Sequence, residues 1–219
     1  DLYRAPMWHA EYDFEKRTPY ASLQTSLGCQ FGCNFCMINI LNRNDNEEVG
    51  VASNYSGMRF WSTEFIIKEF DKLIGMGVKT IRIVDEMFLL NPKYYKPLCK
   101  KLSEINSNDD FRFWAYSRVD TVKKPEILSL VRKAGIKWLC LGIESGKKEI
   151  RLEISKGKFE DVDIREVVKR VHDADIEIMA NYIFGLPGDD KNSMKETFDL
   201  SKELCTSGWN TYAAMALPG

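Results

Sequence analysis

Short apolar runs alternate with amphipathic helical patterns along most of this chain, and this alternation limits the folds open to it. Most of the runs are nearly continuous in apolar character, as parallel strands buried on both faces are. The runs expected to form strands lie at residues 21–27, 80–84, 111–116, 138–143, 177–184 and 211–217. Strands and helices in this order predict an α/β fold with a parallel sheet and right-handed crossover connections.

Helices are expected between these runs, because each intervening segment carries an apolar stripe and a boundary signal. The stripes predict helices at residues 64–76, 92–105, from 125 onward, around 164–171 and at 193–204. Thr63 is expected to cap the first helix, Pro92 and Pro125 to open the next two, and Gly135 to end the third. Residues 37–61 are polar and irregular. A connection of this length is either a substrate-facing lid or a surface excursion.

The pattern does not decide whether the sheet curls into a partial barrel or stays open and doubly wound. A Rossmann-type sheet is the main alternative, but the first run ends in cysteines and not in a glycine-rich phosphate loop. We expect residues 1–19 to form a lead-in or linker segment and residues 20–219 to form one domain that is incomplete at its C-terminal end.

Composition indicates a globular chain without a strong preference for nucleic acid or membranes. Of the 219 residues, 44% are hydrophobic and 29% are charged, and the net charge is −1. Such a balance provides no positive field for nucleic acid or anionic lipid. No apolar run is long enough to cross a membrane. Free thiols suit a reducing compartment, so we expect a cytoplasmic protein.

Three cysteines lie close together at Cys29, Cys33 and Cys36, and no fourth cysteine follows nearby. Iron–sulfur clusters are usually held by four thiolates, so three would leave one iron of a 4Fe–4S cube without a protein ligand. Zinc also suits thiolates, but a structural zinc site needs four ligands, and His9 and His172 are far away in the sequence. The odd number and tight spacing argue against a disulfide framework. Cys99, Cys140 and Cys205 lie in separate elements and are interpreted as structural.

The Cys-x3-Cys-x2-Cys spacing resembles that of the radical S-adenosylmethionine (radical SAM) enzymes, and further motifs extend the resemblance from about residue 20 to the end. The resemblance implies a partial (βα)6 barrel that is truncated in its last unit. It implies that Cys29, Cys33 and Cys36 ligate a 4Fe–4S cluster, whose open iron is chelated by the methionine part of SAM. One electron from the cluster would cleave SAM to a 5′-deoxyadenosyl radical, which abstracts hydrogen from a substrate.

The resemblance also assigns SAM contacts to residues at the C-terminal ends of the strands, where chemistry gathers in parallel α/β folds. An acid after the second run, Asp85 or Glu86, would bind the SAM ammonium through a charge-assisted hydrogen bond, and Glu86 is favoured. Ser117 and Arg118, after the third run, are also expected to contact SAM. Arg118 would pair with the SAM carboxylate, because a guanidinium group can bind a carboxylate through two hydrogen bonds. The residues assigned to the nucleoside are Phe35, Glu144, Ser145, Ile183, Gly185 and Leu186.

The runs VDEMF, GIESG and FGLPGD most resemble the branch in which a cobalamin-binding domain precedes the radical SAM domain. This implies cobalamin held by a domain absent from the chain, and a methylation or rearrangement of a small-molecule or biosynthetic substrate. A flavodoxin or ferredoxin-type protein would donate electrons. Two alternatives stay open, a tRNA methylthiotransferase-like radical SAM enzyme and a non-catalytic iron–sulfur electron carrier. The near-neutral charge does not favour RNA.

Overall fold

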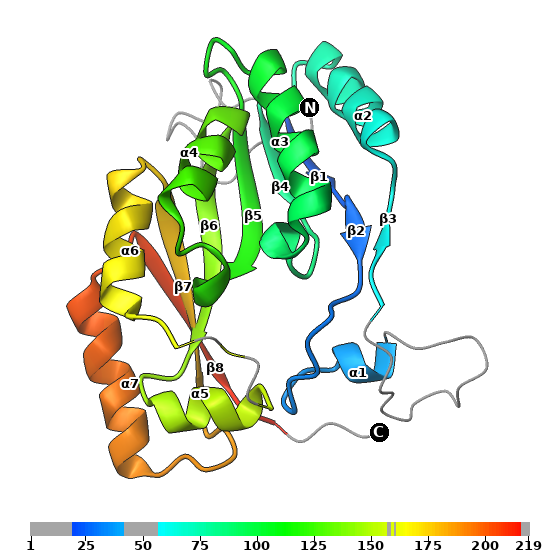
Figure 1. Cartoon of the computed structure of the whole chain (residues 1–219). Coiled ribbons are helices and arrows are strands. Elements are labelled where there is room, and N and C mark those ends of the chain that lie inside the picture. The colour runs from blue at the N-terminus through cyan, green and yellow to red at the C-terminus, as the bar shows by residue number, and fades with distance from the viewer. Residues whose placement is uncertain (1–18, 42–56, 157–158, 160, 216–219) are drawn as a thin grey trace.

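The computed structural model describes residues 19–41, 57–156, 159 and 161–215 (Figure 1). Its centre is a six-stranded parallel sheet in the order β1-β4-β5-β6-β7-β8, curled into a half-barrel. The strands are β1 (Tyr20–Leu23), β4 (Thr80–Ile83), β5 (Arg112–Arg118), β6 (Ile136–Glu144), β7 (Glu177–Phe184) and β8 (Gly208–Ala213). The predicted parallel α/β sheet and its partial-barrel form are therefore confirmed.

The predicted length of the first strand is wrong, because the run at 21–27 divides into β1 and a second short strand. This second strand, β2 (Ser26–Leu27), pairs antiparallel with β3 (Arg59–Phe60) outside the main sheet. The chain thus leaves the sheet after Leu23 and reaches the cysteines from a separate two-stranded ribbon. The last run also shifts, since β8 lies at Gly208–Ala213 and not at 211–217.

Helices cover the outer face of the sheet (Figure 1). They are α2 (Thr63–Gly75), α3 (Pro92–Ile105), α4 (Pro125–Ala134), α6 (Ile164–Asp173) and α7 (Lys191–Leu204), close to the predicted ranges. The cap of α2 is Ser62 and not Thr63, because the Ser62 side chain accepts from Phe65 N. Two short helices were not predicted, α1 (Ile38–Leu41) and α5 (Lys148–Ile154), and two 3-10 turns lie at Phe88–Leu90 and Val119–Thr121. Most of the irregular segment at 37–61 lies outside the described residues.

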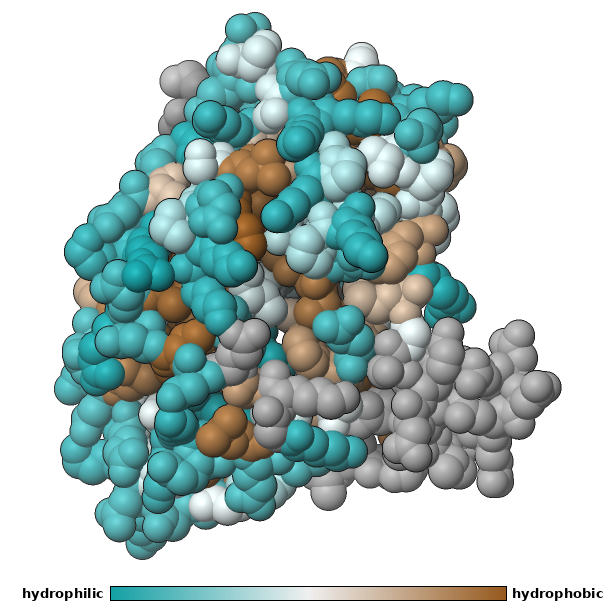
Figure 2. Space-filling model, in the orientation of Figure 1, coloured by the Kyte–Doolittle hydropathy of each residue, from teal (hydrophilic) through white to brown (hydrophobic). Residues whose placement is uncertain are grey.

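The core lies between the outer face of the sheet and these helices. Phe70 on α2 packs edge-on against Phe113 on β5, with ring centroids 5.0 Å apart, and both are almost fully buried. Seen from the helix side, the surface is mostly hydrophilic, with apolar patches between the helices (Figure 2). No helix among the described residues has the length and apolar character to span a membrane.

Gly135 is predicted to be essential to the packing of α4 on β5. It ends α4 in the left-handed region at φ +108°, and a Cβ there would lie 2.8 Å from Asn106 Nδ2 and 3.1 Å from the Phe113 ring. We expect Gly135→Ala to lower the free energy of unfolding by about 2–4 kcal/mol, from backbone strain and overpacking together. Urea denaturation measures this.

The matched control is Gly75→Ala at the end of α2, where nothing lies within 4 Å of the added Cβ. There we expect no loss of stability, because alanine is the better helix former. Equal destabilisation by both variants would contradict the packing argument.

Candidate functional site

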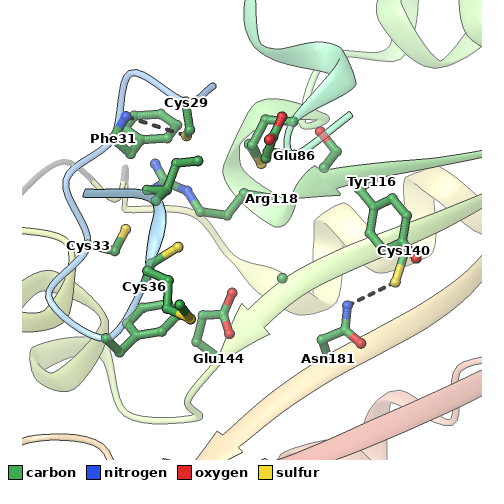
Figure 3. Close-up of a pocket in the computed structure, with 16 residues that line it drawn as sticks. Cys29, Phe31, Cys33, Cys36, Glu86, Tyr116, Arg118, Cys140, Glu144 and Asn181 are labelled. Carbon is green, nitrogen blue, oxygen red and sulfur yellow. Dashed lines mark hydrogen bonds between the residues drawn. The ribbon is translucent and has the colours of Figure 1, made fainter. Parts of the chain in front are cut away.

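The three clustered cysteines lie on the loop between β2 and α1, and all three line one cavity of about 390 Å³ (Figure 3). The loop closes over the C-terminal ends of the sheet strands, as expected for a parallel α/β fold. The other lining residues are Phe31, Phe35, Met37, Ile38, Glu86, Met87, Tyr116, Ser117, Arg118, Cys140, Gly142, Glu144 and Asn181.

Figure 3 shows the three cysteines and Arg118 on the same side of the cavity. Burial raises the pKa of all three, that of Cys33 to about 11, and the positive charge of Arg118 partly offsets the rise for Cys29 and Cys33. Phe31 N donates to Cys29 Sγ at 3.5 Å. No group of three His, Cys, Asp or Glu side chains in the described part of the chain is already arranged as a metal site. Binding of one cluster would therefore bring the three cysteine sulfur atoms closer together.

This donor set fits an iron–sulfur cluster. Sulfur ligands from one short loop face a shared cavity, and thiolates are the usual ligands of such clusters. Ligation requires deprotonation of the thiols, so cluster binding is coupled to proton release. The nearby Arg118 cation favours the anionic form that ligation needs.

Arg118 is held in place by a buried ion pair. Its Nε and Nη2 donate to the two Asp120 carboxylate oxygens at 2.6 and 2.7 Å. Its guanidinium carbon lies 3.9 Å from the Phe31 ring centroid and 4.5 Å from that of Phe159. Asp120 therefore already accepts from the two Arg118 nitrogens that could bind the SAM carboxylate through paired hydrogen bonds. That contact stays a prediction.

The adjacent acids after β4 occupy different environments. Asp85 is buried, and its carboxylate accepts from Thr25 N at 2.6 Å, Thr25 Oγ1 at 2.5 Å and Ser26 Oγ at 2.7 Å. Glu86 is exposed, lines the cavity and accepts from Gly28 N at 3.2 Å. Asp85 thus ties the end of β4 to the corner between β1 and β2, whereas Glu86 faces the cavity.

Glu144 lines the cavity at the end of β6. Its backbone is left-handed at φ +65°, beside a register shift in the pairing of β6 with β7. Burial raises the pKa of its carboxyl group to about 7, and the positive charge of Arg118 partly offsets this rise. Near neutral pH this group can both donate and accept a hydrogen bond. Ser145 does not line the cavity, since its Oγ accepts from Lys147 N at 3.1 Å in a buried turn.

Of the apolar and glycine residues predicted to meet the nucleoside, only Phe35 lines the main cavity. Phe35 lines both this cavity and a smaller one of about 210 Å³, which Ile183 also lines. Leu186 is buried in a cluster against which Phe35 and Ile183 pack. Gly185 adopts φ +80°, and its N–H and that of Leu186 both donate to Asp189 Oδ2 at 3.0 Å. The adenine contact itself stays a prediction.

Sequence reasoning missed the part of the cavity formed by Tyr116, Cys140 and Asn181. Asn181 Nδ2 donates to Cys140 Sγ at 2.9 Å. Cys140 is buried in β6, as a structural cysteine would be, yet it also lines the cavity. Counting back two positions from Arg118 would have found Tyr116, and counting back four from Glu144 would have found Cys140, because alternate residues of a strand share one face.

The remaining cysteines and histidines lie away from this cavity or outside the described residues. Cys99 is fully buried in α3, Cys205 is exposed after α7, and neither lines the cavity. His172 is exposed on α6. His9 falls in the part of the chain that the structure does not describe.

Comparison with known families and proteins agrees with this geometry. The family model described as "Radical SAM superfamily" matches residues 23–201. The anaerobic magnesium-protoporphyrin IX monomethyl ester cyclase of Cereibacter sphaeroides is 25% identical over 182 residues, which cover 80% of this chain and 26% of that protein. The hopanoid C-2 methylase of Rhodopseudomonas palustris is 29% identical over 172 residues, covering 77% of this chain and 30% of that protein. The chain thus spans less than a third of either relative.

A solved structure shows the same fold. The radical SAM methyltransferase TsrM from Kitasatospora setae, determined with cobalamin and a [4Fe-4S] cluster bound, superposes with a TM-score of 0.77 at 18% sequence identity. The match covers 94% of this chain and 38% of TsrM.

Proposed function

Because this chain belongs to the radical SAM superfamily, we propose that Cys29, Cys33 and Cys36 ligate a 4Fe–4S cluster and that the cavity beside them binds SAM. The observation that carries the proposal is that all three thiols line the same cavity as Glu86 and Glu144. What the cluster and SAM supply when bound is the reductive cleavage of a carbon–sulfur bond. The chain's own residues bind, orient and enclose the cofactor.

Each of these residues has a distinct task. Glu86 accepts a charge-assisted hydrogen bond from the SAM ammonium group. Glu144, with a pKa raised to about 7, hydrogen-bonds a ribose hydroxyl group. Phe35 and Ile183, which pack over the buried Leu186, provide an apolar surface for the adenine ring and exclude water from it.

The reaction we propose is cobalamin-dependent methyl transfer to a small-molecule substrate, with cobalamin held by a domain outside this chain. Support comes from the hopanoid C-2 methylase and from TsrM, because the names of both proteins describe methyl transfer. Flavodoxin or a ferredoxin is the proposed electron donor. A tRNA methylthiotransferase reaction is less well supported, because the net charge of −1 does not favour RNA binding. Membership of an enzyme family disfavours a simple electron carrier.

Uncoupled SAM cleavage tests this function. The full-length protein, reconstituted without oxygen and given a strong reductant and SAM, is expected to release 5′-deoxyadenosine slowly without substrate. Liquid chromatography measures the product, and the same sample without reductant is the control. Addition of SAM should also change the EPR spectrum of the reduced cluster. A protein with a full cluster and bound SAM that made no 5′-deoxyadenosine would contradict the proposal.

A further inference from the structure

The inner face of the sheet, opposite the helices, carries a buried arginine nitrogen that no described residue hydrogen-bonds. Arg82 on β4 lies in register with Trp114 on β5. In the described part of the chain it forms no ion pair, and its buried Nε has no hydrogen-bond partner. A buried polar donor left unpaired costs free energy, so such a group is usually satisfied by a ligand, by water or by a functional partner.

Aromatic rings fix the position of Arg82. Its guanidinium carbon lies 5.1 Å from the Tyr116 ring centroid and 5.8 Å from that of Trp114. Trp114 in turn stacks on Trp138 of β6, with centroids 5.4 Å apart and planes 7° from parallel. Aromatic faces attract guanidinium groups but do not neutralise their charge. The group is therefore held in one place while remaining available to an anion.

Arg82 also lies next to the cavity. Tyr116, which contacts its guanidinium group, lines that cavity together with Cys140. Burial raises the pKa of the Cys140 thiol to about 11, and the positive charge of Arg82 partly offsets this rise. The field of Arg82 thus reaches the cavity, on the side remote from the cysteine loop.

We propose that Arg82 binds an oxyanion of the substrate, a carboxylate or a phosphate, while a flat apolar part of the same substrate packs on Tyr116. A substrate held in this way extends from Arg82 across Tyr116 toward the cysteine loop. The arrangement selects acids with a planar body, because a neutral analogue leaves the Arg82 charge unpaired in a partly buried site. This inference rests on the proposed function for its reaction, but its recognition chemistry is tested separately.

The test uses equilibrium binding of simple probes. The full-length, reconstituted protein is titrated by calorimetry with 2-naphthoate, with the neutral 2-naphthamide and with 2-naphthyl phosphate. SAM is present at saturation, so that no probe occupies the SAM pocket. We expect the carboxylate or the phosphate to bind about tenfold more tightly than the amide. A hydrogen bond to a charged group contributes free energy of this size. Whichever anion shows the larger preference identifies the oxyanion.

Four variants decide whether Arg82 is responsible. Arg82→Gln should abolish the preference for the anion, and Arg82→Lys should keep part of it. The lysine variant thus distinguishes loss of the positive charge from a folding defect. Tyr116→Leu should weaken all three probes alike. The control Arg59→Gln, at an exposed arginine on β3, should change nothing. Circular dichroism verifies that each variant is folded.

Equal affinity for anion and amide, absence of binding by every probe, or a preference that survives Arg82→Gln would each overturn the inference. Iron content and SAM affinity, measured on the same preparation, decide the proposed function independently of these outcomes.

Discussion

Cys33→Ala is expected to remove the iron–sulfur cluster almost completely, and SAM cleavage with it. Cys33 is one of three thiols facing the cavity, and the loop supplies no other thiol to replace it. Loss of one of three protein ligands leaves two irons of the cube without protein thiolates. Iron and sulfide content after anaerobic reconstitution, together with the visible absorption of the cluster, measures the loss.

The control is the triple variant Cys99→Ser, Cys140→Ser and Cys205→Ser, which we expect to keep the cluster. Cys140 is the informative member, because it lines the cavity but belongs to β6 and not to the cysteine loop. Cys205→Ser alone, at an exposed thiol, controls for any loss of stability in the triple variant. An intact four-iron cluster in Cys33→Ala would refute the ligand assignment. Loss of iron from the folded triple variant would instead indicate a further ligand.

The regular elements of the fold could be predicted because their signals are local. Gly135 ends α4 in the left-handed conformation that its position after an apolar stripe suggests. Helix α5 escaped prediction because its seven residues are too few to show a clear period. The division of the first run could not be foreseen either. It depends on Asp85, which is distant in sequence and binds the corner at Thr25 and Ser26.

The site could be predicted only in part. Cysteine spacing identified the loop that faces the cavity, because all the thiols lie within one short segment. The opposite side of the cavity depends on which face of β5 and β6 is turned inward. Apolar runs buried on both faces hide that choice, so Tyr116 and Cys140 could be placed only by their spacing from Arg118 and Glu144. Likewise, nothing in the sequence Asp85-Glu86 shows which acid turns toward the cavity.

Asp85→Asn is therefore expected to lower the stability of the fold, and Glu86→Gln to lower the affinity for SAM. Asp85→Asn should lower the free energy of unfolding by about 2–4 kcal/mol, because hydrogen bonds to a charged group contribute about 1.5–3 kcal/mol each and an amide can replace only part of the set. The three donors come from Thr25 and Ser26, next to the cysteine loop. Urea denaturation measures the change, and Asp71→Asn on the exposed side of α2 is the control.

Glu86→Gln should leave stability nearly unchanged, because Glu86 is exposed and receives one long hydrogen bond from Gly28 N at 3.2 Å. Its effect should fall on SAM affinity, which we expect to drop by about 10–100-fold if the carboxylate meets the SAM ammonium. Calorimetry with the reconstituted protein measures both variants. If Asp85→Asn weakened SAM binding in a fully folded protein while Glu86→Gln did not, the ammonium site would belong to Asp85, and the hydrogen bonds that now bury it would have to open when SAM binds.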